Sequence, residues 1–294
     1  MAEPPELGDL PDLRSLRRES AARLWAAGVA SPEYDADELL AHVLGTDRGR
    51  LFLAADPTAA QAAEFAALIA RRAAREPLQH LTGVAHFRRV SLRVGPGVFV
   101  PRPETELLAG WAIEWARGAR EHGTREPVVV DLCTGSGAIA RAIADEVPHA
   151  RVHAVELDEA AHDWAARNLA GTGVDLRLGD FATAFDDLAG AVDVVCCNPP
   201  YIPLEAWESV APEARDHDPH LALFSGDDGL EAMRALERRA AVLLRPGGVL
   251  GAEHADVQGD SAPAVFAASG RWADVRDHED LAGRARFLTA RLAR

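Results

Sequence analysis

The stretch VVVDLCTGSG, residues 128–137, decides how this chain folds. Its first half is a continuous apolar run, which is typical of a strand buried on both faces of a parallel sheet. Its second half is rich in glycine, and the residues that follow, 137–147, carry a helical pattern. A strand, a glycine turn and a helix in this order form the setting that a nucleotide-binding loop requires, because glycine lets the backbone approach a ligand closely.

Short apolar runs and helical segments alternate along the rest of this half of the chain. Strands are predicted at 128–132, 151–155, 174–178, 192–197 and 249–253, with a further pair at 272–277 and 286–292. Helices near 137–147, 158–170 and 228–243 separate most of the first five strands. This alternation predicts a parallel sheet that is covered on both faces, with the last two strands added as a hairpin at one edge.

Residues 12–74 predict a separate unit of three helices, with breaks at Gly28 and Gly45. Ser31 and Asp56 each precede a proline, and a capping side chain followed by proline is typical of a helix start. The sequence of this unit carries no cluster of polar residues. We therefore expect it to serve as a docking or lid module without chemistry of its own.

A β-hairpin is predicted between the helical unit and the sheet. In residues 81–100 the β-favouring side chains alternate with polar ones, and Gly-Pro-Gly at 95–97 supplies a turn. The segment FVPRPETE, residues 99–106, follows, and its two prolines stiffen the chain. Its glutamates are predicted to open a helix that runs to about Arg117.

The composition is that of a soluble globular protein. Of its 294 residues, 48% are hydrophobic and 26% are charged, which suits one catalytic domain with a smaller companion. The formal net charge of -15 argues against a site built on nucleic-acid phosphates, because such sites need a basic surface. An acidic chain suits a basic protein partner better.

Cysteine usage and the chain's start bear on the compartment. Cys133, Cys196 and Cys197 are an odd number of cysteines without metal-ligand spacing, which favours a reducing compartment. Residues 1–11 lack the apolar core of a signal peptide, and no apolar stretch is long enough for a membrane helix. We expect a cytoplasmic monomer that contacts no membrane and makes no direct contact with nucleic acid.

A second feature of a nucleoside pocket follows the glycine turn. Glu156 ends the second strand, about 19 residues beyond Gly137, where a carboxylate can accept hydrogen bonds from both ribose hydroxyls. Gly135, Gly137 and Ala140 also fit a dinucleotide fingerprint. Asp131 favours S-adenosylmethionine instead, since it can meet the cationic methionine part. A tight turn without any ligand is the plain alternative.

The motif Asn198-Pro199-Pro200-Tyr201 follows the fourth strand, whose end lies beside the first strand's loop in a doubly wound sheet. An amide nitrogen is a poor nucleophile, so acceptors must hold its N–H groups and aim its lone pair at the methyl carbon. The Asn198 side-chain oxygen and the Pro199 carbonyl can do this, and Tyr201 offers a flat face for a planar group. Catalysis would be positioning, without a metal. A rigid proline turn with no chemistry is the plain alternative.

The polar segment DHDPH, residues 216–220, is weighed as a metal site, but no second ligand cluster accompanies it. It is predicted to be a solvated loop near the mouth of the substrate site.

Four motifs, taken together and in this order, resemble the protein-(glutamine-N5) methyltransferases that modify peptide chain release factors, the HemK/PrmC-like family. They are PLQHLTG at 77–83, FVPRPETE at 99–106, the loop at 131–137 and NPPYIP at 198–203. The resemblance covers nearly the whole chain.

The resemblance implies an α/β fold: a seven-stranded Rossmann-like, class I methyltransferase domain that depends on S-adenosylmethionine, with a small helical domain and a hairpin linker. The implied domains are 1–78 for substrate docking, 79–103 for the linker and 104–294 for catalysis. The implied reaction methylates the side-chain amide nitrogen (N5) of the glutamine in the release factor's Gly-Gly-Gln motif and leaves S-adenosylhomocysteine. It would tune translation termination.

The motifs and the resemblance together assign residues. The predicted donor contacts are Asp131, Cys133, Thr134, Gly135, Ser136, Gly137, Glu156, Asp180, Phe181 and Asn198. The substrate contacts are Asn198, Pro199, Pro200 and Tyr201, of which Asn198, Pro199 and Tyr201 are assigned to catalysis, and no metal is implied. Two positions depart from the family pattern: Cys133 stands where many relatives have glycine, and Glu156 replaces a commoner aspartate.

Three other functions fit parts of the sequence. An adenine-N6 methyltransferase of DNA or RNA faces the same electronic problem and uses the same Asn-Pro-Pro-Tyr loop, but the acidic charge counts against it. A nicotinamide-dependent oxidoreductase could use the glycine turn, yet no convincing proton donor other than Tyr201 accompanies it. A binding module that has lost its activity is the third alternative.

Overall fold

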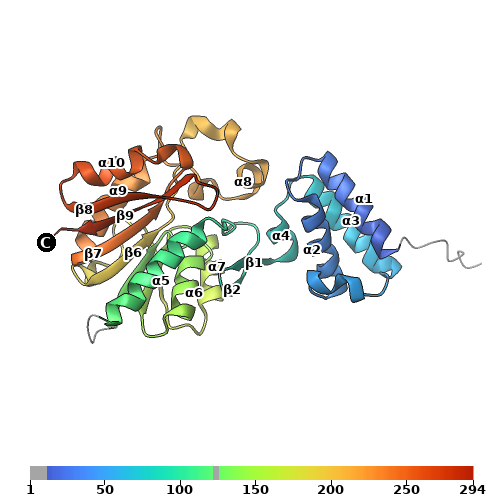
Figure 1. Cartoon of the computed structure of the whole chain (residues 1–294), viewed down its shortest axis with the longest axis horizontal. Coiled ribbons are helices and arrows are strands. Elements are labelled where there is room, and N and C mark those ends of the chain that lie inside the picture. Colours follow the sequence, from blue (N-terminus) through green and yellow to red (C-terminus); the bar gives the residue numbers. More distant parts are fainter. Residues whose placement is uncertain (1–11, 122–125, 294) are drawn as a thin grey trace, which may run out of the picture. The chain divides into compact units, whose positions relative to one another are not determined.

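The computed structural model describes residues 12–121 and 126–293. The chain divides into two compact units, Met1–Gly83 and Val84–Arg294 (Figure 1). The segment predicted as a linker, 79–103, is therefore shared: its start belongs to the helical unit and its hairpin to the larger one. The stretch 1–11, from which the absence of a signal peptide is predicted, lies outside the described residues.

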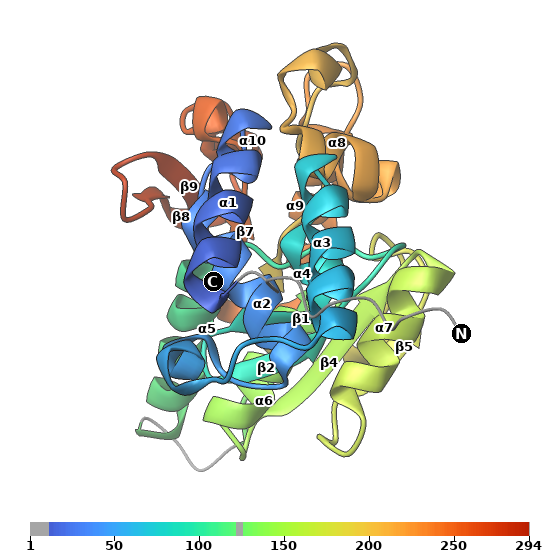
Figure 2. The same cartoon turned by 90° about the vertical axis from the view of Figure 1, so that its right-hand side faces the viewer.

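The first unit is helical, as predicted. Its elements are α1 (Leu13–Ala26), α2 (Pro32–Leu44), the 3-10 helix η1 (Arg48–Leu53), α3 (Ala59–Ala73) and α4 (Leu78–Thr82). The helices α1, α2 and α3 contact one another around a shared apolar core (Figure 2). Gly45 ends α2 at a φ of +64°, a left-handed conformation that glycine adopts without strain.

Two of the predicted helix starts differ in detail. Ser31 does precede α2, with Pro32 as the first helical residue, but its side chain makes no capping hydrogen bond. The start predicted at Asp56 and Pro57 is wrong, because α3 begins at Ala59 behind a capping box formed by Thr58 and Gln61. The carboxylate of Asp56 instead accepts the N–H of Leu13 at 2.9 Å.

The second unit contains the predicted seven-stranded sheet. Its strands are β3 (Val128–Leu132), β4 (Arg151–Glu156), β5 (Asp175–Leu178), β6 (Val192–Cys197), β7 (Leu244–Glu253), β8 (Trp272–Glu279) and β9 (Ala285–Leu292). Their spatial order is β5-β4-β3-β6-β7-β9-β8. The five strands from β5 to β7 are parallel, and β9 and β8 add an antiparallel edge, as predicted.

The strand order places a crevice at the centre of the sheet. The chain runs from β3 outward through β4 to β5 and then returns to β6 on the other side of β3. The loops that leave β3 and β6 therefore diverge, and ligands of doubly wound sheets bind where the strand order reverses. The glycine turn and the Asn-Pro-Pro-Tyr motif follow these two strands.

Helices cover both faces of the sheet (Figure 1). One face carries α5 (Thr105–Glu121), α6 (Ala138–Glu146) and α7 (Glu159–Leu169), and the other carries α9 (Glu231–Leu243) and α10 (Ser261–Ala268). Buried side chains of β3 point alternately to the two faces: Val129 belongs to the first core, and Val128 and Val130 to the second. The continuous apolar run in the sequence reflects this two-sided burial. The remaining short helices are η2 (Asp186–Leu188), η3 (Leu204–Ser209), α8 (Pro212–His217), η4 (His220–Ala222) and η5 (Asp256–Gln258).

The predicted hairpin consists of β1 (Val84–Phe87) and β2 (Val90–Arg93), which pair antiparallel. It is fixed to the larger unit through Asn168 of α7. The Asn168 side chain accepts the N–H of Arg93 at 2.8 Å and donates to the carbonyls of Arg93 and Ser136, each at 2.9 Å. Asn168 thereby connects the hairpin to the glycine turn.

No helix among the described residues combines the length and the apolar character needed to cross a membrane.

Candidate active site

The loops that leave the parallel strands line a cavity at the crevice, which is open to solvent. Of the predicted site residues, its wall includes Cys133, Thr134, Gly135, Ser136, Glu156, Phe181, Asn198, Pro200 and Tyr201. Asp131, Gly137, Asp180 and Pro199 are not part of this wall.

The glycine turn after β3 is shaped by its backbone. Cys133, Gly135 and Gly137 all have left-handed φ angles, of +63°, +58° and +85°. A side chain at such an angle is strained, since its Cβ crowds the backbone. The turn is fixed by the N–H of Thr134, which donates to the carbonyl of Val155 at 3.0 Å. Cys133 therefore stands at a position whose geometry favours glycine.

Asp131 is fully buried beneath this turn. Its Oδ2 atom accepts the hydroxyl of Thr134 at 2.6 Å and the N–H of Ala140 at 3.1 Å, so it ties the turn to the first residues of α6. Burial raises the pKa of this carboxyl to about 7. Its Oδ1 atom is buried without a partner in the described part of the chain. A direct contact between Asp131 and the donor stays a prediction.

Glu156 joins the turn to the end of β4. Its Oε2 atom accepts the N–H of Gly135 at 2.8 Å, and its Oε1 atom accepts the N–H groups of Leu157 at 2.9 Å and Asp158 at 3.0 Å. Burial raises the pKa of this carboxyl, although all three hydrogen bonds oppose the shift. A carboxylate offers about four lone-pair positions, so acceptor capacity remains toward the cavity.

The turn after β5 contributes Phe181, which lies in the cavity wall. The neighbouring Asp180 points elsewhere: its Oδ1 atom accepts the N–H of Ala182 at 2.8 Å and so stabilises the turn.

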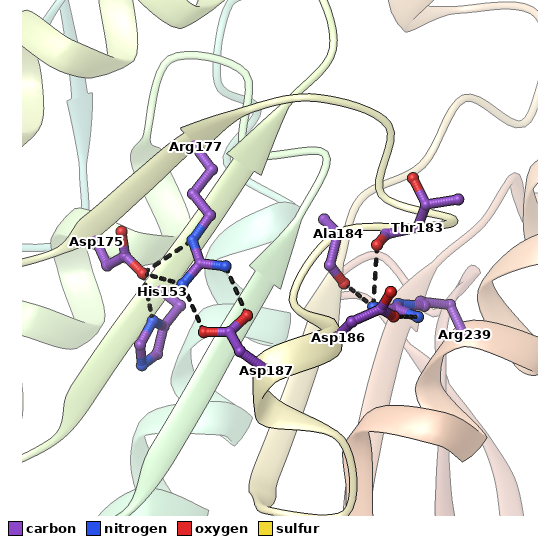
Figure 3. Close-up of polar contacts among 8 residues, drawn as sticks. All are labelled: His153, Asp175, Arg177, Thr183, Ala184, Asp186, Asp187 and Arg239. Carbon is purple, nitrogen blue, oxygen red and sulfur yellow. Dashed lines mark hydrogen bonds and ion pairs between the residues drawn. The ribbon is translucent and has the colours of Figure 1, made fainter.

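Polar contacts anchor the residues after this turn on both sides (Figure 3). Arg177 of β5 donates to Asp187 at 2.7 Å and to Asp175 at 2.8 Å. From α9, Arg239 donates to the carbonyls of Thr183 and Ala184 and to the carboxylate of Asp186, as Figure 3 shows. The segment that presents Phe181 to the cavity is therefore held by two guanidinium groups.

The Asn-Pro-Pro-Tyr loop after β6 is held by side chains from distant parts of the sequence. The Asn198 Nδ2 atom donates to the Thr105 hydroxyl at 3.3 Å, and that hydroxyl donates to Glu253 at 2.7 Å. The Tyr201 hydroxyl donates to the other oxygen of Glu253 at 3.3 Å. The Gln258 side chain donates to the carbonyl of Tyr201 at 3.1 Å, which fixes the backbone of the loop.

Glu253 ends β7 and is fully buried. Burial raises its pKa to about 7, against the hydrogen bond from Thr105 and the positive charge of Arg286. The pKa of the Tyr201 hydroxyl is also raised, first by burial and then by the charge of Glu253. This hydroxyl is therefore a donor at neutral pH.

Several residues of the site are absent from the residue assignments made from the sequence. Phe99, Pro101 and Thr105 line the cavity. All three lie in the segment FVPRPETE, for which the sequence predicts stiffness and a helix start but no role in the site. Glu253 lies in no sequence motif that would indicate a functional role.

The segment 216–220 is not the solvated loop that was predicted. Part of it belongs to α8, and the Asp218 carboxylate is buried against Arg102 at 2.6 Å. Burial raises the pKa of Asp218 to about 6. The pair joins two walls of the cavity, since Pro101 and Pro219 beside it both line the cavity. Within the described ranges, no cluster of three or more potential metal ligands occurs.

Known protein families match both units. A family described as a methyltransferase domain matches residues 129–217, and one described as the PrmC N-terminal domain matches residues 15–83. The sheet topology and the glycine turn, together with the first match, define the class: the protein is a class I methyltransferase that depends on S-adenosylmethionine.

Individual relatives narrow the class. A release factor glutamine methyltransferase of Streptomyces coelicolor is 58% identical over 94% of this chain and 96% of its own length. The chain belongs to the release factor glutamine methyltransferase family, as its motifs predict. A 4-amino-L-phenylalanine/4-methylamino-L-phenylalanine methyltransferase of Streptomyces pristinaespiralis is 43% identical over 89% of each chain. A solved structure, the T. thermophilus 16S rRNA N2 G1207 methyltransferase, matches with a TM-score of 0.45 and 18% identity over 72% of this chain and 44% of that one.

Proposed function

We propose that this enzyme transfers a methyl group from S-adenosylmethionine to the N5 nitrogen of the glutamine in the Gly-Gly-Gln motif of peptide chain release factors, and so tunes translation termination. The relative from Streptomyces coelicolor, which carries the release factor in its name, supports the substrate. The observation that carries the proposal is the shared cavity: Asn198 and Tyr201 line the same cavity as Glu156 and the glycine turn.

The donor fits the residues at one end of this cavity. The glycine turn lies close to the ligand space, where Gly135 has no side chain, and Glu156 keeps acceptor capacity for a ribose hydroxyl. Phe181 supplies an apolar wall for the adenine. When bound, S-adenosylmethionine supplies a methyl group that is already activated by the positive sulfur.

The residues after β6 would prepare the nitrogen. The Asn198 Oδ1 atom and the Pro199 carbonyl accept the two N–H groups of the glutamine amide, which orients its nitrogen toward the donor. The Tyr201 ring gives the planar amide a surface to lie against, and the buried Tyr201 hydroxyl keeps that ring in place. The chain's contribution is positioning, which can supply a large part of a rate enhancement.

A second acceptor is favoured by one comparison. The relative from Streptomyces pristinaespiralis is named for an aromatic amine, whose nitrogen is also planar and conjugated. An enzyme with this loop could accept such an amine in the position that we assign to the glutamine amide.

A methylation assay with isotopically labelled donor tests the proposal. The acceptors are a purified release factor, the same factor with its Gly-Gly-Gln glutamine replaced by alanine, 4-amino-L-phenylalanine, and unmethylated DNA and RNA. We expect label in the intact release factor alone, and mass mapping should place it on the glutamine. Label in the amine alone would favour the second acceptor, and label in nucleic acid alone would refute the proposal.

A further inference from the structure

A chain of three polar groups runs behind the cavity wall. The Asn198 Nδ2 atom lies 3.3 Å from Thr105 Oγ1, which lies 2.7 Å from Glu253 Oε2. Thr105 is the first residue of α5 and is buried, and Glu253 is the last residue of β7. Only Asn198 and Thr105 of these three line the cavity.

The number of protons available to these three hydrogen-bonded groups decides the orientation of the Asn198 side-chain amide. A threonine hydroxyl carries one proton and can accept through its lone pairs. A carboxylate only accepts, so the single proton of Thr105 is committed to Glu253. The Thr105 oxygen then faces Asn198 as an acceptor. A rotated amide would set two oxygens against each other, because the Asn198 Oδ1 atom would meet lone pairs instead of a proton.

We propose that Thr105 and Glu253 are positioning residues, which hold the Asn198 side chain with its oxygen toward the acceptor nitrogen and its NH2 group away from it. The inference rests on the proposed function, since it names the acceptor's N–H as the group that meets the Asn198 oxygen. A rotated Asn198 would present N–H groups to the N–H groups of the glutamine and repel it.

The second oxygen of Glu253 extends the same arrangement to Tyr201, whose hydroxyl donates to it at 3.3 Å. One carboxylate therefore sets the orientation of two of the four predicted substrate contacts of this loop, Asn198 and Tyr201. The charged groups that act on Glu253 are Arg286 of β9, which favours its ionised form, and Glu104, which opposes it. Protonation of Glu253 would favour the opposite orientation of the Asn198 amide. The Glu253 O–H could then donate to Thr105, and the threonine hydroxyl could donate to the Asn198 oxygen.

Steady-state kinetics of the full chain on a release factor test this arrangement. We expect Thr105→Val and Glu253→Gln each to lower kcat by about 100-fold, while the KM for S-adenosylmethionine stays within about threefold. Thr105→Ser keeps the hydroxyl and should retain kcat within about threefold of the wild type. In the wild type kcat should rise as pH increases through about 7, where Glu253 ionises, and this rise should be absent in Glu253→Gln.

A matched control is Glu237→Gln. Glu237 is also a buried carboxylate, but it accepts from Arg271 at 2.7 Å and Trp272 at 2.8 Å on the other face of the sheet. Its removal should leave kcat and the pH profile unchanged. Unchanged kcat in both Thr105→Val and Glu253→Gln would overturn the inference, and so would a loss in Thr105→Ser as large as in Thr105→Val.

A measurement without substrate separates this inference from the proposed function. In 15N-labelled enzyme the Asn198 side-chain NH2 signals, identified by their absence in Asn198→Asp, should shift with the ionisation of Glu253. The shift should vanish in Glu253→Gln and Thr105→Val. If the wild type does not methylate release factors but shows this titration, the proposed function is refuted and the positioning roles of Thr105 and Glu253 are supported. If the Asn198 signals of the wild type do not change with pH, the positioning roles are refuted.

Discussion

The two loops that face each other across the crevice are built by different means. The turn after β3 is defined by its own backbone: Cys133, Gly135 and Gly137 have left-handed φ angles, and Gly135 donates its N–H to Glu156. The loop after β6 is defined by partners far away in the sequence, since Asn198 and Tyr201 depend on Thr105 and Glu253. Substitutions that change backbone freedom should therefore disturb the turn after β3, and substitutions that remove single polar atoms should disturb the loop after β6.

The largest expected effect is that of Asn198→Ala. It removes the acceptor oxygen and should lower kcat by about 1000-fold, because a lost acceptor of this kind costs several kcal/mol in the transition state. The affinity for S-adenosylmethionine, measured by calorimetry, should change little, since the turn after β3 is untouched. Unchanged turnover would contradict the role assigned to the loop after β6.

Gly229→Ala tests how far the loop after β6 depends on its surroundings. Gly229 has a φ of +72°, and an added Cβ would lie 2.4 Å from the carbonyl oxygen of Tyr201 and 2.8 Å from the Gln258 side chain. We expect a loss of about 3 kcal/mol in the free energy of unfolding, from strain and overpacking together. Gly135→Ala is the matched control, with a φ of +58° and no atom within 4 Å of the added Cβ. It should cost only about 1 kcal/mol. Equal losses, measured by denaturant unfolding, would show that only the backbone angle matters.

The pH dependence of stability sharpens the comparison further, because each loop has one buried carboxyl behind it. Burial raises the pKa of Asp131 and of Glu253 to about 7 in the folded chain. A raised pKa means that the folded state holds its proton more tightly, so the stabilisation is complete below the ordinary pKa and is lost as pH rises through about 7.

We therefore expect the free energy of unfolding to fall between pH 5 and pH 7 by about 2 kcal/mol for each carboxyl. Denaturant unfolding at a series of pH values measures this, and Asp131→Asn should remove about 2 kcal/mol of the fall. The rest should remain, because burial also raises the pKa of Glu253, Glu156 and Asp218. A free energy that rises with pH over this range would contradict the assignment.

The smallest effect is expected from Cys133→Gly. Cys133 has a φ of +63°, and glycine removes the crowding of its Cβ. The gain in the free energy of unfolding should be about 1 kcal/mol, after the greater freedom of glycine in the unfolded chain is subtracted. Cys133→Ala is the control, because it removes the thiol but keeps the Cβ. If alanine stabilises the chain as much as glycine does, the backbone angle is not the cause.

The sequence predicted the parts of the site that are local. The apolar run of β3, the glycine turn after it and Asn-Pro-Pro-Tyr after β6 are each contiguous, and the reversal of strand order brings their ends together. The sheet and its antiparallel edge were predicted for the same reason. The helix α10 was not predicted; it carries Pro263 in its first turn, where proline is tolerated.

The supporting residues could not be predicted in this way. Thr105 and Glu253 are 148 residues apart and meet only because α5 and β7 pack together in the folded sheet. Asp218 was predicted to lie in a solvated loop because no second ligand cluster accompanies its segment, yet its carboxylate contacts Arg102, 116 residues away. Charge and polarity in a short window do not reveal a partner that only the fold supplies.

The hydrogen bonds of Asn168 to Arg93 and Ser136 determine where the chain can be divided. A shortened chain that begins at residue 104, where the catalytic domain was predicted to begin, would leave the Asn168 amide with one of these three hydrogen bonds. It would also uncover Trp164, which donates to the carbonyl of Pro96. A shortened chain that begins at Val84 would keep them all. The methyltransferase domain can therefore be exchanged between relatives only together with the β1–β2 hairpin that precedes it.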